Sequence, residues 1–193
     1  MSVGRDRLIV NCGPAPNNNI TWKKALESSA AHSCLVINNT NSSSVQNSGE
    51  TKINVSREVT SGFEIISAKH NGYEALYSAI HKRILKLDSR GTLLKGVDSI
   101  ISGPGVEFKI HFHLHHKVNV RLTRNKKRIL LQLPSGGWEF FILKNNTSLS
   151  LSIDKSIYLE DNGLIKNTNQ FIINGKTTNS GAKIEWCLSK KTL

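Results

Sequence analysis

The stretch from Glu107 to Leu122, EFKIHFHLHHKVNVRL, alternates apolar and polar side chains more regularly than any other part of the chain. Successive residues of a strand point to opposite faces, so this spacing predicts a β-strand with one apolar face. The apolar face consists of Phe108, Ile110, Phe112 and Leu114. The opposite face consists of Lys109, His111, His113 and His115. A strand of this kind needs a core on one side, which indicates a layered sheet protein.

The histidine face allows three interpretations. Same-face neighbours on a strand lie about 6.5–7 Å apart at the backbone, so two imidazoles can converge on one metal ion but three in a row rarely can. The face could instead bind an acidic ligand, or form the polar outer side of a half-buried antiparallel sheet. We expect the polar outer side and keep the other two as alternatives.

The remaining chain reads as short strands separated by turns rich in Gly and Asn, with almost no helical periodicity. We expect strands at residues 57–68, 76–87, 93–100 and 128–133, a turn at HNGY (70–73), and a hairpin turn at RNKKR (124–128). The polar run 38–52 has too few apolar groups to pack and is predicted to be a mobile loop. The fold class that follows is all-β, a layered antiparallel β-sandwich forming a single domain over residues 1–193.

Composition narrows the partners. The net charge of +12 and the pI of about 9.8 favour a polyanion, either an acidic polysaccharide or nucleic acid. No nucleic-acid-binding motif accompanies the charge, so acidic polysaccharide is the stronger candidate. Three cysteines without a CxxC pair argue against a disulfide framework and a thiolate zinc site. No apolar run approaches the roughly 20 residues that a membrane-spanning helix needs.

Several segments, in order and spacing, resemble the C-terminal domain of the heparinase II/III family of polysaccharide lyases. They are LIVNCG (8–13) with Trp22 and AAHSCLVIN (30–38), HNGYEALYSAIHKRILKL (70–87), GPGVEFKIHFHLHHKV (103–118), and the tail SIYLEDNGLIKNTNQFIINGKTTNSGAKIEWCL (156–188). The resemblance implies an enzyme with a helical toroid followed by a β-sandwich. Such lyases cleave uronic-acid polysaccharides by β-elimination, with catalytic side chains mainly on the toroid.

This chain has no segment helical enough to be a toroid. We therefore expect a C-terminal fragment, cut at its N-terminal edge, that comes from a split gene, a truncated gene or an incomplete gene model. No catalytic residue is assigned to it, and whether it is an enzyme by itself stays open. The expected partners are an acidic, uronic-acid-containing polysaccharide and the missing toroid domain. The family places it in the periplasm or cell envelope, with the cytoplasm as the alternative.

The resemblance also indicates individual site residues. His32 matches a histidine that completes a zinc site in some family members, although Asn11 stands where those members have an acidic ligand. No cofactor is required, and a hydrogen-bonded histidine at the start of a buried strand is the alternative for His32. His81 and Arg83 match a segment of the family's sheet and are candidates for substrate binding. Arg83 could bind a uronate carboxylate or form a salt bridge to a sheet neighbour.

Three functions follow from these features. The first is the sandwich domain of a heparinase-like lyase, inactive as an isolated chain. The second is a non-catalytic basic module that binds acidic polysaccharide. The third is a structural or interaction domain whose charge serves solubility.

Overall fold

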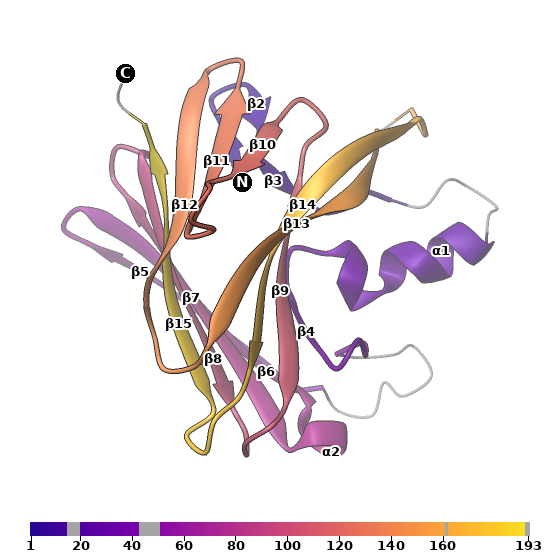
Figure 1. Ribbon diagram of the computed structural model, residues 1–193, viewed down its shortest axis with the longest axis vertical. Helices are drawn as coiled ribbons and strands as arrows, with labels where there is room; N and C mark the ends of the chain where they lie inside the picture. The colour runs from indigo at the N-terminus through magenta and orange to yellow at the C-terminus, as the bar shows by residue number, and fades with distance from the viewer. Residues whose placement is uncertain (15–19, 43–50, 161, 192–193) are drawn as a thin grey trace.

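Two antiparallel sheets pack against each other in the computed structural model, which describes residues 1–14, 20–42, 51–160 and 162–191 (Figure 1). The larger sheet has eight strands in the order β10-β11-β12-β15-β8-β7-β6-β5. These strands are β5 (Ile53–Thr60), β6 (Phe63–Tyr73), β7 (Ala79–Asp88), β8 (Leu93–Ile101), β10 (Asn119–Leu122), β11 (Arg128–Leu133), β12 (Gly136–Asn145) and β15 (Ala182–Lys190).

The smaller sheet has the order β13-β14-β9-β3, and β4 also pairs with β9. Its strands are β3 (Ile9–Val10), β4 (Leu35–Ile37), β9 (Glu107–Leu114), β13 (Leu149–Leu159) and β14 (Ile165–Lys176). The remaining elements are the hairpin of β1 (Ser2–Val3) and β2 (Asp6–Arg7), helix α1 (Ile20–Glu27), a 3-10 turn (Ser29–Ala31) and helix α2 (Glu74–Tyr77). The predicted antiparallel β-sandwich is confirmed.

The core lies between the sheets and is centred on the apolar face of β9. Phe112 is 2% exposed, and its ring centroid lies 4.7 Å from that of Phe171 and 5.2 Å from that of Trp186. Trp186 packs flat against β8, where a Cβ added at Gly96 would lie 2.1 Å from the indole. The apolar face predicted for this strand is therefore confirmed, and a glycine on β8 makes room for the largest core side chain.

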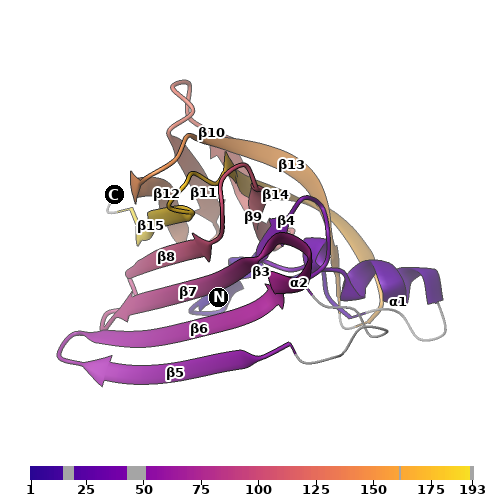
Figure 2. The same ribbon diagram turned by 90° about the horizontal axis from the view of Figure 1, so that it is seen from below.

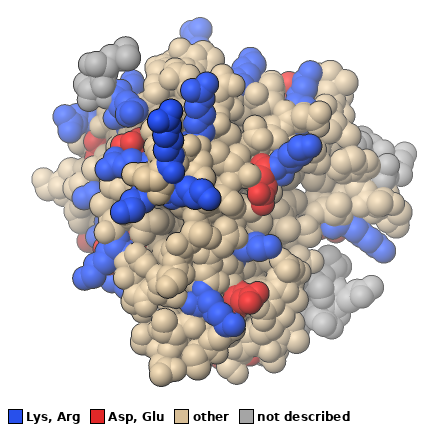
Figure 3. Space-filling model, viewed as in Figure 1, with Lys and Arg blue, Asp and Glu red and all other residues tan. Residues whose placement is uncertain are grey.

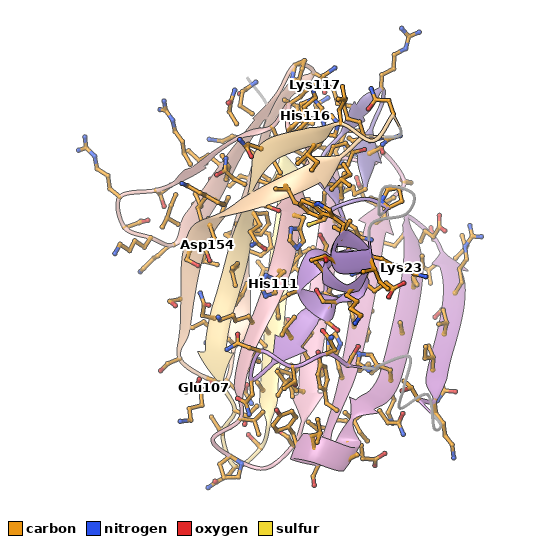
Figure 4. All side chains as sticks on the ribbon, turned by 90° about the vertical axis from the view of Figure 1, so that its right-hand side faces the viewer. Lys23, Glu107, His111, His116, Lys117 and Asp154 are labelled. Atoms are coloured by element: carbon orange, nitrogen blue, oxygen red, sulfur yellow. The ribbon has the colours of Figure 1, made fainter. Side chains whose placement is uncertain are left out.

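The prediction of a polar outer face for the same strand is wrong at its centre. His111 is 7% exposed and His113 is 2% exposed. His113 Nε2 lies 2.9 Å from the carbonyl oxygen of Ala30, and His113 Nδ1 lies 2.8 Å from the hydroxyl of Ser156. The 3-10 turn covers this face of the small sheet at His113, and Figure 4 shows α1 on the same side of the sheet. The alternation of side chains along the strand predicts which residues share a face. It does not predict that another part of the chain covers that face.

Three local predictions also need revision or confirmation. The strand expected at 57–68 is split by a turn at Ser61–Gly62, where Gly62 takes φ +94° and the chain reverses from β5 into β6. The turn expected at HNGY instead lies in β6, with a register shift between His70 and Tyr73. The hairpin turn at RNKKR is confirmed. Residues 43–50 of the predicted mobile loop lie outside the described residues.

The large sheet extends beyond the small one. Every residue of β5 is exposed, and Figure 2 shows β5 at the edge of the large sheet farthest from the small sheet. Strand register places Ile53 and Val55 on the inner face, because their row continues through β6, β7 and β8 to the buried face of β15. The inner face of β5 and β6 is therefore an open shelf beside the sandwich core.

Candidate functional site

A fully buried carboxylate, Asp98 on β8, organises the polar side chains at the boundary between the core and this shelf. Asp98 is 0% exposed, and the pairing of β7 with β8 places Arg83 directly opposite it. Asp98 Oδ1 accepts hydrogen bonds from Arg83 Nε (2.7 Å) and His81 Nε2 (2.8 Å), and Oδ2 accepts one from Trp186 Nε1 (2.8 Å). Burial by itself raises the pKa of Asp98, but the charge of Arg83 and the bond from His81 outweigh it, so the pKa is lowered.

The network continues through a second histidine. His81 Nδ1 lies 3.3 Å from His70 Nε2, and the Gly72 N–H donates to His70 Nδ1 over 3.2 Å. Because Nδ1 of His70 accepts, a neutral His70 carries its proton on Nε2 and donates it to His81, whose Nε2 proton is then left for Asp98. Burial lowers the pKa of His70 to about 4, helped by the neighbouring charges of His81 and Arg83. This chain of bonds is therefore complete with a neutral His70 at pH 7.

Arg83 connects the network to the neighbouring loop. Its Nη1 donates to the carbonyl oxygen of Ser33 over 2.9 Å, while its Nη2 is buried and has no hydrogen-bond partner among the described residues. The side chains of Arg83 and His81 are 17% and 6% exposed. The salt bridge to a sheet neighbour that the sequence allowed for Arg83 is present, and the substrate contact expected of both residues stays a prediction.

Sequence reasoning brought His81 and Arg83 together on one strand face but missed their partners. Asp98 is the one acidic residue in the run LLKGVDSII. A carboxylate inside a largely apolar strand has to be paired when it is buried, and this pattern could have predicted a cationic partner. His70 was assigned to a turn, so its place beside His81 depended on the register of β6 with β7.

His32 lies on the loop next to this network. Its Nδ1 donates to the Ser28 carbonyl oxygen over 2.9 Å, and the Asn11 side-chain oxygen accepts from the Ser33 N–H over 2.9 Å. Among the described residues, no group of three or more His, Cys, Asp or Glu side chains is arranged to hold a metal ion. A zinc site needs about four donors, so zinc bound at His32 would require ligands from another segment or chain. The zinc role of His32 stays a prediction.

A cysteine and a histidine also meet below the loop. Cys12 Sγ lies 3.5 Å from His113 Nδ1, a distance at which a histidine can activate a thiol. However, burial raises the pKa of Cys12 and lowers that of His113 to about 4, so the thiolate–imidazolium pair is disfavoured. This pair is part of the buried structure of the loop.

A tyrosine and a histidine meet just beyond the C-terminal end of β9. Arg7 Nη1 donates to the Tyr158 hydroxyl, and the ring of His115 contacts the Tyr158 ring edge-on at 4.7 Å between centroids. These residues, with Glu160 and Asn162, line an open cavity of about 400 Å³. Tyr158 is 5% exposed, so its ring packs within the fold.

The two-sheet architecture defines the chain as an antiparallel β-sandwich, a fold that it shares with solved heparan sulfate lyases. The heparan sulfate lyase HepC from Pedobacter heparinus superposes on 96% of this chain with a TM-score of 0.79 and 13% identity, and the chain covers 29% of that enzyme. A heparinase III gene product gives a TM-score of 0.75 over 95% of the chain at 12% identity, with 28% of its own length covered. Heparinase III gives 0.71 over 94% of the chain at 12% identity, with 27% covered.

The family model described as "Heparinase II/III-like, C-terminal" matches residues 1–187. The chain therefore belongs to the heparinase II/III-like C-terminal domain family, as the sequence resemblance indicated. A search of curated protein sequences gives no significant match. The chain spans less than a third of the length of the lyases whose fold it shares.

Proposed function

We propose that this chain is the β-sandwich part of a lyase that cleaves uronic-acid polysaccharides by β-elimination, and that it needs a helical domain for turnover. The observation that carries the proposal is the family match over residues 1–187 in a chain that covers only 29% of a heparan sulfate lyase of the same fold.

The state of the polar groups supports inactivity of the isolated chain. β-Elimination needs a base to remove the proton at C5 of the uronate and a group that neutralises the adjacent carboxylate. The network around Asp98 supplies no free base, because both carboxylate oxygens accept protein hydrogen bonds. Arg83 Nη2 is a donor with no acceptor among the residues that the structure describes, which suits a contact with an oxygen from a partner domain or from a uronate.

The shelf supports the need for a second domain. Ile53, Val55 and Val59 on β5 are 67%, 67% and 72% exposed, and Ile66 on β6 is 40% exposed. Aliphatic side chains grouped on one face mark an interaction surface, and an open edge strand with such a face is a liability unless it is covered. The occupant we propose is the helical domain, since its family counterpart belongs to the same enzyme as this sandwich.

The test compares the chain alone with the chain supplied with a helical lyase domain, each incubated with heparan sulfate or alginate. Unsaturated product is detected by its ultraviolet absorbance. We expect no product from the chain alone and product from the combination, reduced by Val55→Ser. Product from the chain alone would refute the proposal, and Tyr158→Phe would then show whether the cavity at Tyr158 is responsible.

A second candidate function is a non-catalytic module that binds acidic polysaccharide, favoured by the net charge of +12. It predicts salt-sensitive binding to a uronic-acid polymer without any helical lyase domain in the same or a neighbouring gene. Figure 3 shows lysine and arginine side chains widely spread over one face of the molecule, with few acidic ones between them.

For the compartment, no helix in the described part of the chain is long and apolar enough to cross a membrane. We propose the periplasm or cell envelope, because the resemblance to the family implies it. Detection of the native protein in the cytoplasmic fraction alone would contradict this assignment.

A further inference from the structure

Four lysines on the outer face of the large sheet form an unusual arrangement. Lys69 on β6 is the direct cross-strand partner of Lys82 on β7, and Lys86 on β7 is the direct partner of Lys95 on β8. Like charges directly opposite each other on a sheet destabilise it. We call Lys69, Lys82, Lys86 and Lys95 the lysine quartet.

Strand register places the quartet on the side that faces away from the small sheet. Leu85 and Gly96 lie in the row that reaches Trp186 in the core, so their neighbours Lys86 and Lys95 point to the opposite face. Lys69, Lys86 and Lys95 are exposed, and Lys82 is half-buried. The quartet is therefore on the outer face of the large sheet, opposite the shelf and the network around Asp98.

The quartet is not neutralised locally. In the described part of the chain, none of the four lysines has a carboxylate oxygen within 4.0 Å. Among the nearby acidic groups, Glu185 is held by Lys183 at 2.9 Å, and Asp88 accepts bonds from the Thr92 and Leu93 amides. Glu58 on β5 lies in the same transverse row as Lys86, with Ile65 of β6 between them. This single carboxylate does not balance four lysines, so the face keeps an excess of positive charge.

The quartet consists of two cationic pairs on either side of an apolar strip. Each like-charged pair bridges adjacent strands, which lie about 4.8 Å apart. The two pairs are four residues apart along β7, or about 13 Å. Ile84 and Val97, a half-buried cross-strand pair, form an apolar strip between them. Repeating carboxylate or sulfate groups on a chain that crosses the strands would meet cations at both edges of an apolar strip.

We propose that the lysine quartet is a binding site for an anionic polysaccharide strand, separate from the shelf proposed to carry the helical domain. The choice of polymer rests on the proposed function, whereas the location of the site rests on strand register. Bound there, a long substrate would stay attached to the sandwich while another part of it is cleaved elsewhere in the complete enzyme.

The experiment measures binding of a size-defined heparin oligosaccharide by calorimetry over a series of salt concentrations. The quartet variant carries Lys→Gln at all four positions. The matched control carries Lys→Gln at Lys23, Lys24, Lys117 and Lys155, which are exposed. Figure 4, drawn from the small-sheet side, shows Lys23 and Lys117 there. Both variants lower the net charge from +12 by four, to +8.

We expect the quartet variant to bind at least tenfold more weakly and the control less than threefold more weakly. The slope of log affinity against log salt should fall by about 3 in the quartet variant, at roughly 0.7–0.9 per cation contact. Equal weakening by both variants, or binding by neither the parent chain nor the variants, would overturn the site. Duplex DNA bound with the same affinity and the same dependence on the quartet would overturn the assignment to polysaccharide.

Two features separate this test from other failures. Removal of two repulsive pairs should leave the denaturant midpoint of the quartet variant unchanged or higher, so weaker binding does not reflect unfolding. Binding is measured without turnover, so a failed turnover experiment refutes the lyase proposal and leaves the binding result intact.

Discussion

Replacement of Asp98 by Asn tests whether the buried carboxylate is the central support of the fold. The carboxylate accepts from Arg83, His81 and Trp186 with its two oxygens. Asn replaces one of those oxygens with a donor and removes the negative charge, so the Arg83 guanidinium stays buried without its counter-ion. Loss of one partner of a buried ion pair costs about 3–5 kcal/mol, out of a typical total of about 5–15 kcal/mol.

The assay is equilibrium unfolding in urea, followed by tryptophan fluorescence. We expect the free energy of unfolding of Asp98→Asn to fall by about 3–5 kcal/mol. Asp154→Asn, at an exposed position on β13, is the matched control and should change it by less than about 0.5 kcal/mol. The double variant Asp98→Leu/Arg83→Met removes both charges and should be more stable than Asp98→Asn, since an apolar pair can replace a buried ion pair.

The pH dependence gives an independent check. The pKa of Asp98 is lowered in the folded chain, so its contribution is fully present above the unfolded value of about 3.9 and is lost as the pH falls below it. The difference in stability between the parent chain and Asp98→Asn should therefore shrink below about pH 4. A loss under about 1 kcal/mol at pH 7, or a difference that stays constant in acid, would refute the assignment of Asp98 as the charged centre of the network.

Three further outcomes follow from the structure. Gly96→Ala places a Cβ 2.1 Å from the Trp186 indole and should lower the free energy of unfolding by about 1–3 kcal/mol through overpacking. Gly103→Ala is the control, because the space around Gly103 is open, and it should lower the free energy of unfolding little. A smaller loss for Gly96→Ala than for Gly103→Ala would contradict the packing of Trp186 on β8. Burial lowers the pKa of His113 to about 4 from an ordinary 6.5, so the free energy of unfolding should fall as the pH drops through 6.5 toward 4. His113→Gln should reduce this loss, and a variant with the same pH profile of unfolding as the parent chain would contradict the role of His113. Val59→Ser on the exposed shelf should alter the free energy of unfolding of the isolated chain by less than about 0.5 kcal/mol, and a larger loss in urea would mean that the shelf is already covered.

The buried network also bears on the substrate-binding role that was expected of Arg83. Arg83 was a candidate for substrate binding, yet two of its three side-chain nitrogens, Nε and Nη1, donate to Asp98 and Ser33 within the chain. Its Nη2 has no acceptor within the described part of the chain. Arg83 is therefore already oriented by contacts within the sandwich, and its contact with a substrate stays a prediction.

The sequence by itself determined the all-β sandwich and the faces of its central strand. The alternation from Phe108 to Leu114 requires those side chains to share one face, whatever else the chain does, because the strand period is two. The ordered segments of the tail and of the 70–87 stretch likewise identified the family that the match over residues 1–187 shows. Local turn chemistry at RNKKR was also readable, since it depends on neighbouring residues alone.

Tertiary structure decided what covers each face and which polar groups meet. His113 is buried because the turn at Ala30, from far earlier in the chain, folds over β9, and the His111 side chain lies 2.8 Å from Gln170 of the neighbouring β14. Asp98 meets Arg83, and Lys86 meets Lys95, because of the register between strands, which a one-residue slip would change at every position. Pairing across strands is a long-range property, so single-sequence periodicity predicts the faces of each strand but not the partners of its charges.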